Sequence, residues 1–348
     1  MKKLFGILCI LCLMLSGCAK KSVEKPIAPS PTPMTEYRTL KISENPSLYA
    51  YADMEKDLET LSLAYKDFTQ LAVIGKTPDG RNIYDFIIGS ANADTHAVIH
   101  GSIHAREYIT TKLVMKQLAY YLENLSKNTG SYKGISYSDL FNNIALHIVP
   151  MVNPDGVTLC QYGLNGLNTD TAKQNVKNIT LLDGYTDFSQ WKANVNGVDL
   201  NRNYDALWNE YIGPSHPSSD RYKGTSPGSE SETKALMSIT EKYPVKRTIS
   251  YHTYGQVIYW YFAQTGTLLN DTKSFAKEIS DITGYPTDAN YSQLDPAGYK
   301  DWAISKLNIP SLTIEVGYGK NPVPDTQFEG IWSENKDVWA GMLYDLKF

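Results

Sequence analysis

Four short clusters of polar residues carry side chains that could do chemistry. The first is His104-Ala105-Arg106-Glu107. An imidazole and a carboxylate three residues apart can face one point in space, and both groups are common zinc ligands. The same spacing also fits a surface turn in which Arg106 pairs with Glu107. This cluster alone therefore does not establish a metal site.

The second cluster is the run Ile249-Ser250-Tyr251 with His252 at its end. His252 could supply a third ligand for such a metal. A catalytic zinc ion takes three protein ligands and leaves one coordination position open. Taken alone, His252 could equally be a core histidine with a satisfied hydrogen bond. Other histidines have no evident acidic or histidine partner in the sequence: His96, His147 and His216.

The third and fourth clusters add an arginine and a glutamate. In Gly197-Val198-Asp199-Leu200-Asn201-Arg202, the guanidinium of Arg202 suits a carboxylate, and Asn201 adds a donor. In Leu312-Thr313-Ile314-Glu315, a glutamate ends an apolar strand. A carboxylate in such a place is typical of a general base with a raised pKa. The alternatives are a structural arginine in a loop and a strand-end glutamate that reaches solvent.

In their order along the chain, the four clusters resemble the zinc carboxypeptidase family of the carboxypeptidase A type. The resemblance covers about residues 45–345. Three further segments support it: Asn153-Pro154-Asp155-Gly156, the third cluster extended to Asn203, and the helix start Ser229-Glu230-Ser231-Glu232. The joint pattern is more specific than any one of these short motifs.

The resemblance implies one Zn²⁺ ion per chain, bound by three side chains: His104, Glu107 and His252. It also implies that Glu315 takes a proton from water and later passes one to the leaving amine. Asn201 and Arg202 would hold the free carboxylate next to the scissile bond. Tyr291 corresponds to the family's mobile tyrosine, if two residues are inserted before Asp301-Trp302.

Two departures from the family pattern bear on the substrate. The usual Trp-Arg pair, whose Arg polarises the scissile carbonyl, is Trp191-Lys192 here, so the positive charge comes from a point donor. Its context, Trp191-Lys192-Ala193-Asn194, is similar to the bacterial branch that cleaves γ-D-glutamyl–diamino acid bonds in peptidoglycan stem peptides. Lys300 stands where the family lines the pocket for the side chain after the cut, and a lysine favours a carboxylate there. An exposed lysine at a helix start is the alternative.

The leading hypothesis is therefore a zinc peptidase that hydrolyses the bond between γ-D-glutamate and meso-diaminopimelate in muropeptides. Its partners would be a peptide or muropeptide substrate, and we expect a monomer. A general metallocarboxypeptidase that releases C-terminal residues is one alternative. A peptide-binding lipoprotein without turnover is another. The formal net charge is −4 and no basic patch is evident, so no nucleic acid partner is expected.

The elements that position these residues can be predicted from their periodicity. Strand-like runs occur at residues 71–74, 83–88, 97–99, 144–151, 247–251, 257–261 and 311–316. Helical patterns occur at residues 51–68, 109–127, 229–243 and 271–283 and at the C-terminus. Residues 157–195 are rich in Asn and Gly and are expected to be surface loops. The prediction is a single α/β domain with a twisted, mixed parallel and antiparallel central sheet and helices on both faces, as in carboxypeptidase A.

The N-terminus predicts an exported lipoprotein. Lys2 and Lys3 precede an apolar run, residues 4–15, which is shorter than the roughly 20 residues that span a bilayer. Leu15-Ser16-Gly17-Cys18 resembles a bacterial lipobox, so we expect a lipid on Cys18 and a location at the extracytoplasmic face of the membrane. An ordinary cleaved signal peptide is the alternative.

This interpretation divides the chain into three segments: a signal peptide at 1–17, the lipidated cysteine with a flexible tether at 18–40, and the catalytic domain at 41–348. Pro, Ser and Lys dominate the tether. Cys160 would then be the only one of the four cysteines left as a thiol. Neither an intrachain disulfide nor a cysteine zinc site is therefore expected.

Overall fold

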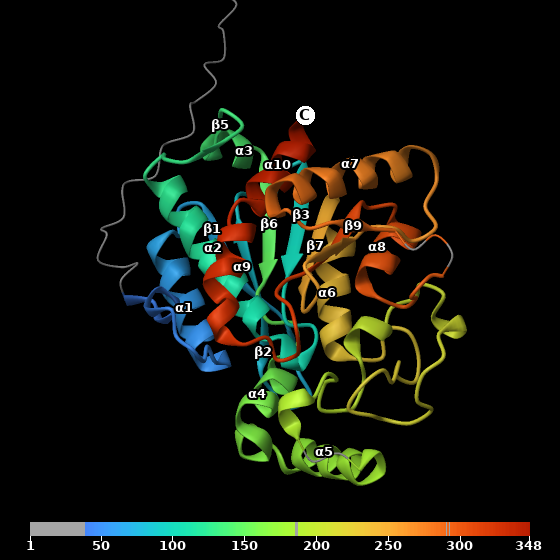
Figure 1. The fold of residues 1–348 in the computed structure, drawn as a ribbon. Coiled ribbons are helices and arrows are strands. Elements are labelled where there is room, and N and C mark those ends of the chain that lie inside the picture. Colours follow the sequence, from blue (N-terminus) through green and yellow to red (C-terminus); the bar gives the residue numbers. More distant parts are fainter. Residues whose placement is uncertain (1–38, 185–186, 290, 292) are drawn as a thin grey trace, which may run out of the picture.

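A computed structural model describes residues 39–184, 187–289, 291 and 293–348 (Figure 1). The predicted signal peptide and Cys18 lie outside these residues. The folded part extends back to Leu40, whose side chain is buried in the core. Within the described ranges, no helix is both long and apolar enough to cross a membrane.

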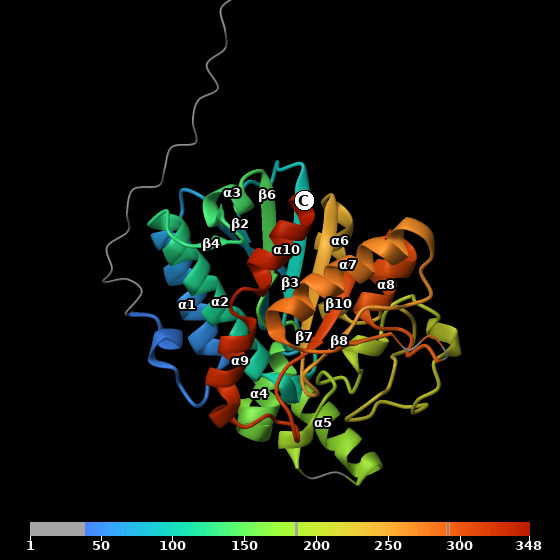
Figure 2. The same cartoon turned by 45° about the horizontal axis from the view of Figure 1, so that its top comes forward.

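An eight-stranded mixed sheet forms the centre of the molecule, in the order β1-β2-β6-β3-β7-β10-β8-β9 (Figures 1 and 2). Its strands are β1 (Thr69–Lys76), β2 (Asn82–Ile88), β3 (Thr95–His100), β6 (Ile144–Val149), β7 (Val245–His252), β8 (Val257–Tyr259), β9 (Thr287–Asp288) and β10 (Ser311–Glu315). The four central strands β6, β3, β7 and β10 are parallel, and β1, β2 and β8 join by antiparallel pairing. The predicted mixed sheet is confirmed, and the strand-like runs at 71–74 and 83–88 form the antiparallel pair β1 and β2.

Helices cover both faces of the sheet, as predicted. They are α1 (Tyr51–Ala64), α2 (Ile109–Ser126), α3 (Tyr137–Phe141), α4 (Pro154–Tyr162), α5 (Asp170–Asp183), α6 (Ser231–Lys242), α7 (Gly266–Thr283), α8 (Tyr299–Leu307), α9 (Phe328–Asn335) and α10 (Val338–Lys347). Side chains alternate across a strand, so Ile99 packs in the core under α1, α2, α7, α9 and α10, and Val98 packs under α6 and α8. Figure 2 shows α2, α9 and α10 in front of the sheet. A small hairpin, β4 (Ser131–Tyr132) and β5 (Ile135–Ser136), lies apart.

The prediction of surface loops at residues 157–195 is wrong. This segment contains most of α4 and all of α5. The side chain of Thr169 accepts a hydrogen bond from the Ala172 backbone N–H and so caps the start of α5. This cap offsets the low helix propensity of the asparagines in α5. Ala172, Val176 and Ile179 then form one buried stripe, which packs in a third apolar cluster.

The sequence Ser229-Glu230-Ser231-Glu232 fits a capping box at the start of α6, but this capping box is not formed. Helix α6 begins at Ser231, and its N-cap residue Glu230 makes no side-chain cap hydrogen bond. The Ser229 hydroxyl instead donates to the Glu230 carboxylate and accepts from the amide of Asn203. The Ser229 hydroxyl therefore takes part in a tertiary contact with Asn203 and does not cap α6.

Two histidines without evident partners in the sequence do have partners in the fold. His96 Nδ1 lies 2.9 Å from His147 Nε2, and His147 Nδ1 lies 2.6 Å from the carboxylate of Asp85. All three side chains are buried. The contacts join neighbouring strands β3, β6 and β2, so only the strand order reveals them. This polar cluster is part of the sheet and takes no part in the site described next.

Candidate active site

The candidate site lies where the parallel strands end. Strand β3 ends at His100, β7 at His252 and β10 at Glu315. The register aligns these ends, because His100 pairs with Ser250 and Glu315 pairs with His252. The carboxyl ends of parallel strands are where open α/β sheets place their ligands. Two of the four polar clusters are thus brought together by the sheet itself.

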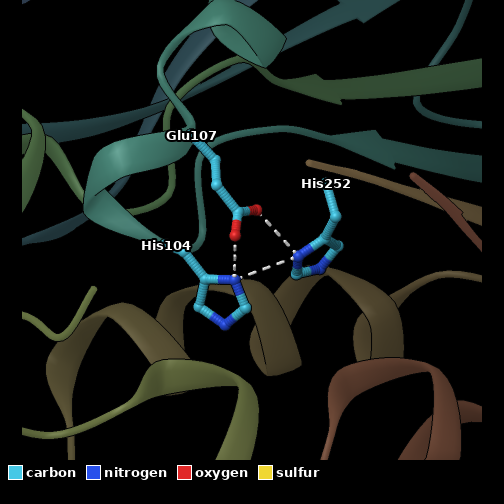
Figure 3. Close-up of side chains that lie close together, drawn as sticks. All are labelled: His104, Glu107 and His252. Atoms are coloured by element: carbon cyan, nitrogen blue, oxygen red, sulfur yellow. Dashed lines mark hydrogen bonds and ion pairs between the residues drawn. The ribbon is translucent and has the colours of Figure 1, made fainter. Parts of the chain in front are cut away.

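Three predicted metal ligands converge at this edge (Figure 3). His104 precedes the short 3₁₀ helix η3 (Ala105–Glu107), which turns Glu107 back toward His252. Glu107 Oε1 lies 2.8 Å from His104 Nδ1, and Oε2 lies 3.0 Å from His252 Nδ1. The two Nδ1 atoms are 3.1 Å apart. All three side chains are buried, and their ligand atoms lie within 4.8 Å of one another.

The donor set fits a tetrahedral metal ion. Ligand atoms on a tetrahedron with bonds of about 2.1 Å lie about 3.4 Å apart, which is close to the separations in this triad. Burial opposes ionisation of Glu107, but His104 and His252 hold the pKa of this carboxyl well below its ordinary value. The charged carboxylate and two imidazole nitrogens are thus available as ligands. Three protein ligands leave one position open for a reacting molecule.

Asp199 orients His104 for this role. Its Oδ1 lies 3.2 Å from His104 Nε2 and accepts a hydrogen bond from the Asn201 backbone N–H. A proton on Nε2 that is shared with Asp199 leaves the Nδ1 lone pair for a metal. Asp199 is fully buried. Asp199 lies in the third cluster, two residues before Asn201, but the sequence alone did not indicate this role.

Glu315 presents a carboxyl group with a raised pKa to the same space. Its Oε2 is buried and has no hydrogen-bond partner among the residues that the structure describes. Burial, together with the charge of Glu107, raises the pKa of Glu315 to about 8, against the opposing effect of His104 and Lys192. A divalent cation in the triad would lower this value. A carboxylate poised near neutral pH is suited to proton transfer.

Lys192 lies beside the triad, but it is paired. Its Nζ is 2.8 Å from Asp199 Oδ2 and 3.4 Å from Asp220 Oδ1. Burial opposes the charge, but these two carboxylates raise the pKa of Lys192 above its ordinary value, so the ammonium stays charged. Asp199 therefore links His104 and Lys192 through one carboxylate. This link fixes a positive charge close to the metal ligands.

Asn201 and Arg202 lie in the same cleft, and a loop aspartate already contacts the arginine. Arg202 Nη2 is 2.6 Å from Asp295 Oδ2, and Nη1 donates to the carbonyl of Asn201. The Asp295 side chain is 74% exposed, whereas that of Arg202 is 12% exposed. Asn201 Oδ1 accepts from the Tyr299 backbone N–H and so faces the start of α8. Arg202 is thus available to a carboxylate that replaces Asp295.

The cleft has a volume of about 540 Å³ and is lined by residues from all four polar clusters and by Lys192 and Asp295, but not by the buried Asp199 or the partly exposed Asp220. Lys300 also lines it, with Nζ donating to the Tyr261 carbonyl at 3.0 Å and to Asp301 Oδ1 at 2.5 Å. Tyr291 is exposed outside the lining, with its ring 4.5 Å from that of Tyr261. The structure therefore puts Lys300 in the cleft and Tyr291 beside its rim.

Asn153 connects the loops that carry the site. It follows β6, is fully buried, and accepts a hydrogen bond from the Gly156 backbone N–H, which begins α4. Its amide donates to the carbonyls of Ile103 and Ala193. These carbonyls directly flank His104 and Lys192 in the chain. One side chain thus fixes the two segments relative to each other.

Comparison with known proteins assigns this architecture. A family model described as zinc carboxypeptidase matches residues 54–338, which include the triad and Glu315. The chain belongs to the zinc carboxypeptidase family. It is accordingly a metallopeptidase, and zinc is the metal that the family implies for the triad.

Two bacterial relatives match this chain over most of its length. The γ-D-glutamyl-L-diamino acid endopeptidase 1 of Lysinibacillus sphaericus is 35% identical over 85% of this chain and 72% of its own. An uncharacterized Bacillus subtilis protein, YqgT, is 31% identical over 88% of this chain and 81% of its own. A metallocarboxypeptidase A of Trichophyton rubrum is 28% identical, over 68% of this chain and 52% of its own.

Solved structures confirm a carboxypeptidase A-like fold. The chain superimposes on carboxypeptidase A from Helicoverpa armigera with a TM-score of 0.65 and 18% identity, over 86% of this chain and 73% of that one. Bovine thrombin-activatable fibrinolysis inhibitor gives a TM-score of 0.68 and 20% identity, over 86% and 97% of the two chains. At these sequence identities, the structural similarity establishes the fold of this chain and nothing further.

Proposed function

We propose that this member of the zinc carboxypeptidase family binds one zinc ion through His104, Glu107 and His252 and hydrolyses the bond between γ-D-glutamate and meso-diaminopimelate in peptidoglycan stem peptides. The observation that supports this substrate is the position of Lys300 in the wall of the cleft. An ammonium has three N–H donors, and Lys300 uses two on the protein, which leaves one for a substrate carboxylate. The relative named for a γ-D-glutamyl-L-diamino acid bond supports the same choice.

The residues around the triad then have distinct roles. Zinc, when bound, supplies Lewis acidity that polarises a carbonyl and activates water. Glu315 accepts the proton of the attacking water and returns a proton to the leaving amine nitrogen. Lys192 places positive charge beside the developing oxyanion. Arg202 and Asn201 orient the substrate through its free α-carboxylate.

A direct test is incubation of the purified protein and zinc with L-Ala-γ-D-Glu-meso-diaminopimelate, followed by mass spectrometry. Release of diaminopimelate is the expected result. Ordinary L-peptides with free C-termini are the comparison, because a general metallocarboxypeptidase would trim them instead. Trimming of these peptides without release of diaminopimelate would overturn the substrate. Binding without turnover of either would favour a binding lipoprotein.

The role of Lys192 leads to a kinetic prediction. We expect Lys192→Met to lower kcat by about 10²- to 10³-fold with little change in KM, because an oxyanion donor acts mainly in the transition state. Lys192→Arg should retain most of the activity, since a guanidinium supplies the same charge. Steady-state kinetics with zinc content measured in parallel would check this. A zinc loss in the methionine variant would mean that Lys192 acts through Asp199 and the triad.

The contact between Asp295 and Arg202 predicts competition with the substrate. We expect Asp295→Asn to lower KM about 3- to 10-fold with kcat unchanged, because Arg202 no longer has to exchange one carboxylate for another. The effect is modest because Asp295 is exposed and its charge is screened. Steady-state kinetics would show it, with Asp205→Asn as the control, an exposed aspartate that pairs with Lys306. A higher KM would contradict the prediction and make Asp295 a substrate contact.

We also propose that Cys18 carries a lipid that holds the enzyme at the extracytoplasmic face of the membrane, within reach of the cell wall. The support is the lipobox-like Leu15-Ser16-Gly17-Cys18 and the apolar run before it. Fractionation of cells that express the wild type and Cys18→Ser would test the anchor. The wild type should sediment with membranes and the variant should not. Equal distribution of both would contradict the proposal.

A further inference from the structure

A row of polar residues across three neighbouring strands forms part of the lining of the cleft. Thr313 on β10 pairs with Tyr259 on β8, and Tyr259 pairs with Asp288 on β9. Register partners on neighbouring strands point to the same face of a sheet, and all three residues line the cleft. Strand β9 is the last strand of the sheet, so Asp288 lies at the outer end of this row.

Asp288 differs from the other aspartates that line the cleft. Asp295 pairs with Arg202, and Asp301 pairs with Lys300. Among the residues that the structure describes, the side chain of Asp288 has neither a hydrogen-bond partner nor an ion-pair partner. It is exposed at the edge of the pocket. The cleft therefore contains a carboxylate without a counter-charge of its own.

Lys300 supplies the opposite charge in the same pocket. Its side chain is mostly buried, and it is held by the Tyr261 carbonyl and by Asp301, so its ammonium has a fixed position. The Asp301 carboxylate is in turn fixed at the start of α8, because it accepts a hydrogen bond from the Gly298 backbone N–H. A fixed cation in the wall of the cleft and an exposed carboxylate at its edge suit a ligand that carries both charges at one end.

We propose that Asp288 and Lys300 together form a receptor for a zwitterionic side-chain end, in which Lys300 binds the carboxylate and Asp288 binds the ammonium. This inference rests on the proposed function and adds to it a residue that recognises the second charge. The distal end of meso-diaminopimelate carries both groups on one carbon. Lysine has the ammonium without the carboxylate, and 2-aminopimelate has the carboxylate without the ammonium. The pocket thus selects diaminopimelate against both.

The test uses three substrates of the form L-Ala-γ-D-Glu-X, where X is meso-diaminopimelate, L-lysine or L-2-aminopimelate. The zinc-loaded wild type should prefer diaminopimelate by about 10- to 100-fold in kcat/KM over each of the others. Asp288→Asn should lower kcat/KM for diaminopimelate and lysine and leave 2-aminopimelate unchanged. Lys300→Met should lower it for diaminopimelate and 2-aminopimelate and leave lysine unchanged. Each variant therefore removes the preference that depends on one charge.

Matched controls are available on the surface. Asp281→Asn removes an exposed carboxylate that pairs with Lys277 on α7, and Lys306→Met removes an exposed ammonium that pairs with Asp205. Both should retain the wild-type preference. If Asp288→Asn leaves the ratios of kcat/KM among the three substrates unchanged, the proposed receptor is wrong and the proposed function stands. If the wild type cleaves none of the three but trims ordinary peptides, the proposed function fails and the receptor fails with it.

Discussion

Glu315→Gln is expected to lower kcat by about 10²- to 10⁴-fold, the usual contribution of a general base. Glutamine keeps the size of the side chain and removes its capacity to take a proton. The substitution also removes a carboxyl that is costly to ionise in this buried place, since burial and Glu107 raise its pKa to about 8. We therefore expect the variant to fold at least as stably as the wild type. Turnover, zinc content and thermal unfolding of both proteins would check this.

The decisive control is the unchanged metal site. Glu315 is not among the three converging ligands, so Glu315→Gln should bind zinc as the wild type does. A matched variant is Glu334→Gln, a glutamate that contacts Tyr285 and Gln256 away from the triad and should keep full activity. Near-wild-type turnover in Glu315→Gln would assign the proton transfer to another group. Loss of zinc in that variant would make Glu315 part of the metal site.

His252→Ala is expected to abolish both turnover and stabilisation by zinc. A ligand that binds only the folded state raises the free energy of unfolding, by about 4 kcal/mol when free zinc is 1,000 times Kd. The wild type should show this rise in denaturant unfolding, because His104, Glu107 and His252 come together only in the fold. The variant retains two of these ligands and should show little rise.

Unfolding measured with zinc and with a chelator separates metal binding from damage to the fold. His216→Ala is the control, because His216 is exposed and its ring is hydrogen-bonded only to the carbonyl of Pro217 among the described residues. It should respond to zinc as the wild type does. If His252→Ala is stabilised as strongly as the wild type, the triad is not the zinc site. If it unfolds early even with a chelator, His252 also supports the core of β7.

Those features of the site that follow from strand ends could be predicted from the sequence. His252 and Glu315 each end an apolar run, so their place at one edge follows from parallel strands. His104 and Glu107 are close in sequence, and their spacing predicts a shared ligand position. The mixed sheet with helices on both faces followed from the alternation of strand and helix patterns.

Features that depend on contacts between distant loops could not be predicted. Asp295 and Arg202 are 93 residues apart in the sequence, and neither residue has a local pattern that indicates the other. The buried contact between Asp85 and His147 depends on strand order in the same way. Helix α5 was missed for another reason. Its apolar stripe of Ala172, Val176 and Ile179 is narrow, and asparagines hide it.

The order in which the fold closes decides when the enzyme can first bind its metal. Glu107 and His252 are 145 residues apart, and they meet only after β7 pairs with β3. Contacts between residues so far apart in the sequence form late in folding, because the chain loses the entropy of a long loop before the contact stabilises it. A nascent or partly folded chain therefore has no complete site and no activity. By mass action, a substitution that loosens the central strands should weaken apparent zinc affinity even when it lies far from the triad.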